Sequence, residues 1–338
     1  MSRLISAISV LLLFATSVDA DSFQNGVDAY ESGDYLTAIK KLESLAIQGH
    51  VKAQYYLGVI YNNEGVEQDD EEAVKWFTRS AKQGYASAQL ALGLMYDKGL
   101  GIPQDYEKAA QWYKLAAEQN NAEAQFKFGS IYYYGKGVTS DFRKALTWYT
   151  LSAKQGYADA QFSLGYMYEV SKDVPRDYRE AAKWYKLSAQ QGHAIAQNNL
   201  GLMYSNGYGI TQNYEEAVKW YRKSADQGYS IAQNNFGLMY LSGSGGITKD
   251  YKKAFKWFKL AAEQGNENAQ FNLGNIYAKG LGIDKDYVDA YKWWTIAGAN
   301  EHGRARMEKE RIEKKMTPGE IANAQELAKL WLEGHENN

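Results

Sequence analysis

The sequence contains no cysteine among its 338 residues. This absence excludes disulfide bonds, thiol nucleophiles, thiolate metal sites and attachment of a lipid to a cysteine. Histidine is also scarce, with four residues, and none of them has a second histidine four positions away. The sequence therefore has too few suitably spaced histidines for a metal centre or a catalytic triad built on histidine. We therefore expect no catalytic residues, no metal site and no cofactor.

The sequence also has no excess of basic residues. The 38 lysines and arginines are balanced by 40 aspartates and glutamates, and the formal net charge is -2. Proteins that bind nucleic acids or anionic membranes through charge have a clustered basic surplus. We therefore expect no nucleic acid partner. After the first twenty residues no apolar run is long enough to span a bilayer, so we expect no membrane insertion of the mature chain.

The first twenty residues have the pattern of a secretory signal peptide. Arg3 supplies the positive start, Leu4 to Ala15 is a short apolar run, and Val18-Asp19-Ala20 provides a cleavage site. The alternative is an uncleaved anchor, but the apolar run is short for a bilayer. We expect cleavage after Ala20 and a mature protein that is exported, either periplasmic or secreted.

A long internal repeat dominates the rest of the chain. Seven glutamines are separated by 35, 36, 36, 36, 36 and 37 residues: Gln54, Gln89, Gln125, Gln161, Gln197, Gln233 and Gln270. Seven tryptophans follow the same period: Trp76, Trp112, Trp148, Trp184, Trp220, Trp257 and Trp293. A fixed period between 20 and 50 residues indicates stacked supersecondary units.

Each repeat predicts two helices. In the first, Gln89, Leu92, Gly93 and Tyr96 share one helical face. A glycine in a helix costs about 1 kcal/mol relative to alanine, so its recurrence predicts that the second helix approaches closely there. An Asp or Asn such as Asp105 precedes each second helix as an N-cap. A glycine follows most of the second helices, and an asparagine follows one. Both residue types tolerate the left-handed backbone conformation that often ends a helix.

These residues carry a family resemblance. The pattern A-x-A-Q-x-x-L-G-x-x-Y, followed by D-Y-x-x-A-x-x-W-Y-x-x-A-A-x-Q-G, resembles the Sel1-like repeat family, a relative of tetratricopeptide repeats. The resemblance implies an all-α fold, a right-handed α/α superhelical solenoid that acts as an adaptor or scaffold. The resemblance is to exported bacterial members of the family, which often serve in envelope processes or in contacts with host proteins.

The expected organisation has four parts. Residues 1–20 are the signal peptide, and residues 21–50 form a tetratricopeptide-like N-terminal capping repeat. Residues 51–300 hold the seven Sel1-like repeats, and residues 301–338 form C-terminal capping helices and a tail. Solenoids need atypical end repeats whose outer face tolerates water.

Two recurring features are interpreted as structural. The tryptophans and their aromatic neighbours recur too regularly to be a site, so core packing is expected. The Gly-x-Gly loops, such as Gly99-Leu100-Gly101, could be mistaken for phosphate-binding loops. They follow helices and repeat at the period of the chain, which favours turns.

Binding is expected on residues that differ between repeats but share a surface. Positions +1, +5 and +8 from each glutamine form a stripe on the first helix, which tetratricopeptide superhelices present on their concave face. The candidate partner-binding residues are Phe126, Tyr133, Tyr134, Phe162, Tyr166, Asn198, Leu202, Asn234 and Leu238. We expect the aromatic residues to anchor a partner and the amides to hold its backbone. The alternative is that position +1 packs between neighbouring first helices.

The predicted function is a non-catalytic scaffold that binds a protein or an extended peptide in its concave face. One alternative is a cell-envelope enzyme or a protein that binds penicillin or peptidoglycan. Family members of that kind are rich in cysteine, which this chain lacks. A second alternative is a structural spacer in an envelope complex.

Overall fold

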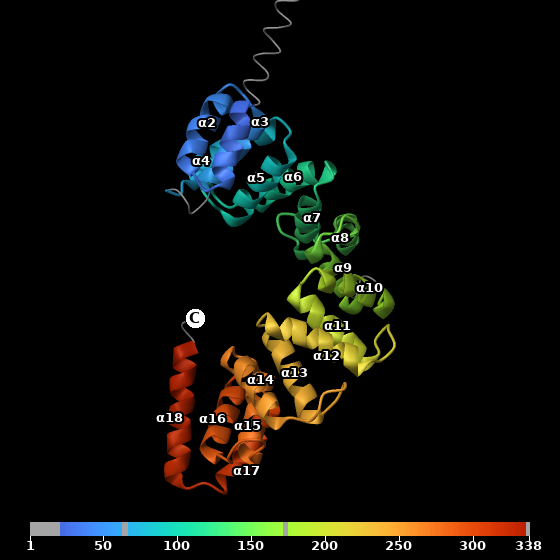
Figure 1. The fold of residues 1–338 in the computed structure, drawn as a ribbon, viewed down its shortest axis with the longest axis vertical. Helices are drawn as coiled ribbons and strands as arrows, with labels where there is room; N and C mark the ends of the chain where they lie inside the picture. The colour runs from blue at the N-terminus through green and yellow to red at the C-terminus, as the bar shows by residue number, and fades with distance from the viewer. Residues whose placement is uncertain (1–20, 63–66, 172–174, 336–338) are drawn as a thin grey trace, which may run out of the picture. The chain divides into compact units, whose positions relative to one another are not determined.

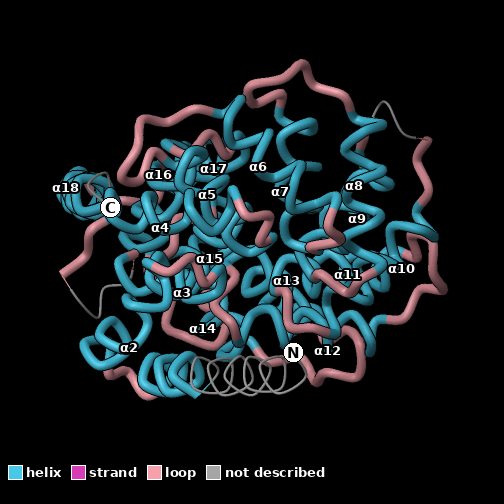
Figure 2. Tube along the Cα trace, turned by 90° about the horizontal axis from the view of Figure 1, so that it is seen from above, coloured by secondary structure: helices cyan, strands magenta, loops and turns pink. Residues whose placement is uncertain are grey.

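The chain is built from helices joined by loops. The computed structural model describes residues 21–62, 67–171 and 175–335. Within those ranges the regular elements are helices and no strand occurs, which confirms the predicted all-α class (Figures 1 and 2). The predicted signal peptide, residues 1–20, lies outside the described residues. The hand of the superhelix stays a prediction.

The seven repeats are seven helix pairs. The first helices are α3 (Val51–Tyr61), α5 (Ala86–Lys98), α7 (Ala122–Tyr134), α9 (Ala158–Val170), α11 (Ala194–Asn206), α13 (Ser230–Ser242) and α15 (Glu267–Lys279). The second helices are α4 (Asp70–Lys82), α6 (Tyr106–Glu118), α8 (Phe142–Lys154), α10 (Tyr178–Gln190), α12 (Tyr214–Asp226), α14 (Tyr251–Glu263) and α16 (Tyr287–Ala299). Contacts run mainly between helices that are consecutive in the chain, as in a solenoid.

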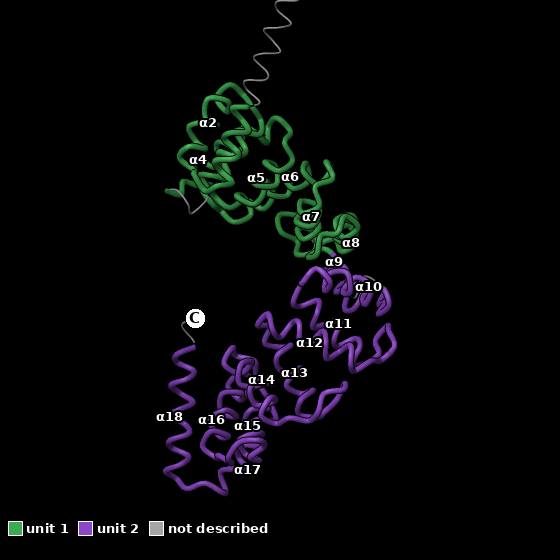
Figure 3. Tube along the Cα trace, in the orientation of Figure 1, with its two compact units in different colours: residues 1–160 green, residues 161–338 purple. Residues whose placement is uncertain are grey.

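The helices form two compact units. The first consists of residues 1–160 and the second of residues 161–338 (Figure 3). Each unit has its own clusters of buried apolar side chains, for example around Tyr113 in the first and around Tyr185 in the second. The boundary lies inside the fourth repeat, where the sequence period continues without interruption.

The predicted ends of the second helices are present. The N-cap residues accept hydrogen bonds from first-turn backbone N–H groups, as Asp105 does from Lys108 over 3.0 Å. After the second helix of the second repeat, Asn120 has a φ of 65°, and Gly84 has a φ of 90° at the same position one repeat earlier. Both are left-handed, so the prediction from glycine and asparagine is confirmed. In the seventh repeat Glu301 takes this position with a φ of 66°.

The glycine of each first helix lets an aromatic ring come close. A Cβ atom on Gly201 would lie 2.8 Å from a ring carbon of Tyr221, which belongs to the second helix of the same repeat. The corresponding glycine meets a ring in every repeat, from Phe77 in the first to Trp294 in the seventh. The expected close approach of the two helices is confirmed, and it explains why a residue that weakens a helix recurs seven times.

The recurring glutamines connect one repeat to the next. The side chain of Gln197, 4% exposed, donates to the carbonyl oxygen of Ala189 over 3.0 Å. The Oε1 atom of Gln197 accepts a hydrogen bond over 2.7 Å from Gln227, the C-cap residue that follows α12. The same relay occurs in other repeats, for instance from Gln119 through Gln89. Leaving such a buried group unpaired costs about 1–3 kcal/mol, so this relay favours one register between repeats.

Additional helices lie at both ends of the repeats. Residues 21–31 are helical and are followed by α2 (Tyr35–Ile47). At the other end come α17 (Gly303–Glu313) and α18 (Pro318–His335). The backbone N–H of Thr317 donates to Glu320 and its hydroxyl accepts from the Glu320 backbone, the reciprocal cap that the sequence predicts. Helix α18 packs on α16 and so covers the last repeat.

Candidate interaction surface

Phe126 and Phe162 pack against the second helix of their own repeat and against the residue that precedes the next first helix. The ring of Phe126 lies 5.5 Å from Tyr149 and 5.4 Å from Tyr157, between ring centroids. One repeat later, Phe162 stacks on His193 with 4.6 Å between centroids. Tyr157 and His193 both directly precede a first helix. Phe126 and Phe162 thus have packing contacts within the protein, made with their own second helix and not only with neighbouring first helices.

The other aromatic candidates of the first unit lie beside Phe126. Tyr133 is half-buried, with its ring 5.3 Å from Phe142 and 6.3 Å from Tyr149. Tyr134 is 68% exposed and meets Tyr133 edge-on at 4.9 Å. Tyr149 contacts both Phe126 and Tyr133, so the structure does bring the three candidates of α7 into one aromatic group. Tyr134 is its exposed member.

Tyr166 is the exposed aromatic candidate of the second unit. Its ring lies 6.4 Å from Phe162 on the same helix, and its side chain is among the exposed apolar ones. Tyr133 and Tyr166 belong to different units, so the predicted anchor consists of two groups, each within its own unit. That they act on one partner stays a prediction.

The amide candidates form buried contacts between repeats. Asn198 and Asn234 are 4% and 6% exposed. The Oδ1 atom of Asn198 accepts from Asn235 over 3.0 Å, and that of Asn234 accepts from Asn272 over 2.9 Å. These amides face the neighbouring repeat and have little surface to offer a ligand backbone. Their polarity is explained by the contact that they make within the protein.

The hydrogen-bond partners of the buried tyrosines were not predicted from the sequence. The hydroxyl of Tyr185 donates to Glu169 over 2.6 Å, and that of Tyr113 donates to Asp97 over 3.2 Å. Burial and the nearby carboxylate raise the pKa of both phenols, so each remains a donor. Both carboxylates occupy position +8. The sequence contains a hint of this pairing. In the sixth repeat the tyrosine is replaced by Phe258, which has no hydroxyl, and position +8 is the apolar Leu241.

An exposed aliphatic surface lies on the first helices of the second unit. We define the first-helix patch as Ile195 and Leu202 on α11, Ile231 and Leu238 on α13, and Tyr166 on α9. All five side chains are between 36% and 43% exposed. Residues seven apart share a helical face, and the bond from Asn235 to Asn198 shows that α11 and α13 are adjacent. Ile195 and Ile231 were missed because they lie two residues before the glutamine, outside the stripe considered.

Two of the histidines have structural roles. His50 and His193 cap first helices, and each accepts a backbone N–H bond through Nδ1. Within residues 21–62, 67–171 and 175–335 no group of three or more acidic or histidine side chains is placed to hold a metal ion. No helix in this part of the chain is long and apolar enough to cross a membrane.

One family model matches most of the chain. The model described as the Sel1 repeat matches residues 51–85, 86–121, 122–157, 158–193, 194–229, 230–266 and 268–302. These segments coincide with the seven helix pairs and account for most of the chain.

Solved structures show the same architecture. One is a protective antigen present in uropathogenic Escherichia coli strains, with an SLR fold. It is 37% identical with a TM-score of 0.86, and the match covers 93% of this chain and 68% of that one. A Sel1 repeat protein from Oxalobacter formigenes is 33% identical with a TM-score of 0.64, covering 71% of this chain and 96% of that one.

A curated relative matches over a short segment. The DAP3-binding cell death enhancer 1 of Rattus norvegicus is 38% identical over 64 residues, which are 19% of this chain and 12% of that protein.

Proposed function

The chain belongs to the Sel1 repeat family, and from this premise we propose that it is a non-catalytic scaffold that binds another protein on the first-helix patch. Proteins of this family generally mediate protein–protein interaction. The proposal rests on one observation: the adjacent helices α11 and α13 expose apolar side chains and contain no charged residue.

Helices α11 and α13 contain no Asp, Glu, Lys or Arg. Each of the other five first helices has at least one charged residue. The two uncharged helices nevertheless expose Ile195, Leu202, Ile231 and Leu238. Contiguous exposed apolar surface of this kind is typical of an interaction site, and depletion of charge is characteristic of the centre of an interface.

The second helices also expose leucines, but in different surroundings. Leu187 and Leu260 are 38% and 37% exposed. Leu187 lies on a helix that also carries Lys183 and Lys186, and α14 carries five charged residues. Single exposed leucines among charges are normal on protein surfaces. These two leucines therefore serve as matched controls for the patch.

The absence of charged residues on α11 and α13 also indicates the chemistry of the partner. A charged group of a ligand buried on α11 and α13 would lose its hydration and find no opposite charge on either helix. The proposed partner segment is therefore aliphatic and uncharged where it touches the patch. An amphipathic helix laid across the two helices fits this chemistry, since it presents apolar residues at three- and four-residue intervals.

The test of the patch starts with a photo-crosslinking residue at Leu202 or Leu238 in the producing cells, followed by identification of the captured protein. The purified partner is then titrated by calorimetry. The double variant Leu202→Asn, Leu238→Asn should lose about 2 kcal/mol or more of binding free energy. The control double variant Leu187→Asn, Leu260→Asn, with leucines of equal exposure, should bind as the wild type does.

Two outcomes would refute the proposal. One is normal binding by the patch variant. The other is loss of binding by the control variant alone, which would place the partner on the second helices. Thermal unfolding of both variants separates loss of binding from loss of structure.

We further propose that the scaffold acts outside the cytoplasm. The support is the N-terminal pattern of Arg3, an apolar run and Val18-Asp19-Ala20. The similar Escherichia coli protein is described as a protective antigen, and an antibody must reach its antigen. Mass spectrometry of the protein recovered from producing cells should give a mature chain that begins at Asp21. Recovery of the full-length chain from the cytoplasm would contradict export.

A further inference from the structure

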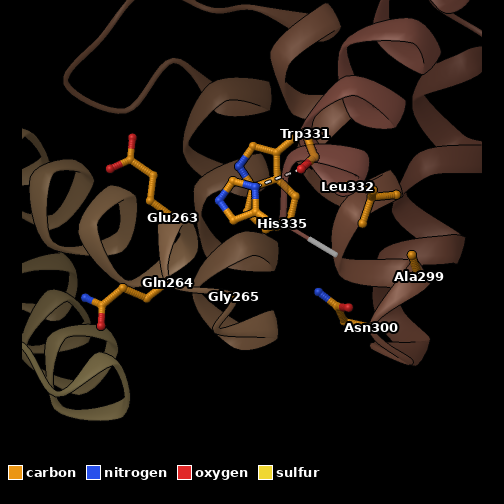
Figure 4. A pocket seen from close by; sticks show the side chains of 8 residues that line it. All are labelled: Glu263, Gln264, Gly265, Ala299, Asn300, Trp331, Leu332 and His335. Atoms are coloured by element: carbon orange, nitrogen blue, oxygen red, sulfur yellow. Dashed lines mark hydrogen bonds between the residues drawn. The ribbon is translucent and has the colours of Figure 1, made fainter. Parts of the chain in front are cut away.

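A second feature of the same unit lies away from the first-helix patch. A hollow of about 740 Å³ separates α18 from the C-terminal ends of α14 and α16. Figure 4 shows the stacked rings of Trp331 and His335 on α18, with Glu263 and Gln264 at the end of α14 and Asn300 at the end of α16. The lining combines a carboxylate, two amides, an imidazole and an indole.

Both amides of the lining donate hydrogen bonds to groups within the protein. The Nε2 group of Gln264 donates to Gln233 over 2.9 Å and to the carbonyl oxygen of Leu260 over 3.3 Å. The Nδ2 group of Asn300 donates to Gln270 over 3.1 Å. The amide nitrogen of Gln264 thus makes two hydrogen bonds within the protein, and that of Asn300 makes one. Each amide also has a carbonyl oxygen, which is an acceptor.

The imidazole also offers an acceptor. The Nδ1 atom of His335 lies 2.7 Å from the carbonyl oxygen of Trp331. A carbonyl oxygen only accepts, so Nδ1 carries the proton and donates it. In the neutral ring Nε2 then carries the lone pair and is a hydrogen-bond acceptor. The imidazole stacks on the indole of Trp331 with 3.8 Å between centroids, which holds both rings in place.

The electrostatic surroundings favour a cation. Glu263 supplies a carboxylate, and the carbonyl ends of α14 and α16 carry the negative ends of two helix dipoles. Lys259 lies 3.8 Å from Glu263, but both side chains are about half exposed, 51% and 49%. Exposed pairs of this kind contribute little, so Lys259 is easily displaced by a cation with better geometry.

We propose that this hollow binds an alkylguanidinium group, the head of an arginine side chain in a partner peptide. The carboxylate of Glu263 and the Nε2 atom of neutral His335 are acceptors in the lining, whereas a guanidinium carries five N–H donors in one plane and no acceptor. The stacked ring pair of Trp331 and His335 adds an aromatic surface of the type on which guanidinium groups stack. The hollow is distinct from the first-helix patch, and the inference does not depend on the proposed function.

The test uses the full mature chain and the indole N–H signals of its tryptophans in NMR spectra. The signal of Trp331 is assigned by its loss in Trp331→Phe. The probe is N-acetyl-arginine amide, and the control ligand is N-acetyl-citrulline amide, which has nearly the same shape but no charge. The arginine probe should shift the Trp331 signal with roughly millimolar affinity, and the citrulline probe should bind at least several-fold more weakly.

A pair of variants tests the carboxylate. Glu263→Gln should weaken the arginine probe by roughly threefold or more, the upper part of what one exposed ion pair contributes. Glu333→Gln removes an exposed carboxylate from α18 outside the lining and should leave the affinity unchanged. The proposal is overturned if the Trp331 signal does not move, if citrulline binds equally well, or if both variants behave alike. None of these outcomes bears on the partner of the first-helix patch.

Discussion

Replacement of Trp184 by alanine is expected to cost roughly 3–5 kcal/mol of unfolding free energy, the range for removal of a large buried aromatic side chain. Trp184 lies on α10 and is 9% exposed. Its indole N–H donates to Glu180 over 3.0 Å. The substitution leaves a cavity at a nearly fully buried side chain and also removes this hydrogen bond.

Urea unfolding followed by circular dichroism measures the loss. Lys186→Ala on the same helix is the control, because Lys186 is exposed and its truncation should change stability by about 0.5 kcal/mol or less. A repeat protein need not unfold in a single step, so the comparison is made on the transition of the second unit. Equal behaviour of the two variants would show that the tryptophan is not part of the core.

Replacement of Gly209 by alanine is expected to cost roughly 2–5 kcal/mol through two separate effects. Gly209 lies in the loop between α11 and α12 with a φ of 71°, and a non-glycine residue pays about 1–2 kcal/mol for this left-handed conformation. In addition, a Cβ atom there would overlap the backbone carbonyl of Tyr178 at the start of α10. Moving the loop away from the preceding repeat costs about 1–3 kcal/mol more.

A second glycine separates these effects. Gly228 has a φ of 90°, but no heavy atom lies within 4 Å of a Cβ atom placed on it. Gly228→Ala should therefore pay only for the backbone conformation, and the difference between the two variants measures the contact with the preceding repeat. If thermal and urea unfolding give the same loss for both, the loop can move freely and does not fasten one repeat to the next.

The sequence by itself determined the elements that repeat. The glutamine and tryptophan periods predicted seven helix pairs, Asp105 and its equivalents predicted where second helices begin, and Asn120 marked a left-handed end. The glycine at Gly201 predicted the approach that Tyr221 makes. These features could be predicted because capping and backbone conformation depend on residues close in the chain, and because seven copies remove the ambiguity of a single one.

The tertiary structure decided which side chains remain free to bind. Asn198 and Ile195 lie three residues apart on one helix, yet Asn198 is buried against the next repeat and Ile195 is exposed. The hollow beside α18 unites Glu263, Asn300 and Trp331, which are far apart in the chain and follow no shared period. Exposure and convergence depend on how neighbouring repeats and the terminal helix pack. The helical period specifies which residues share a face, but not what covers that face.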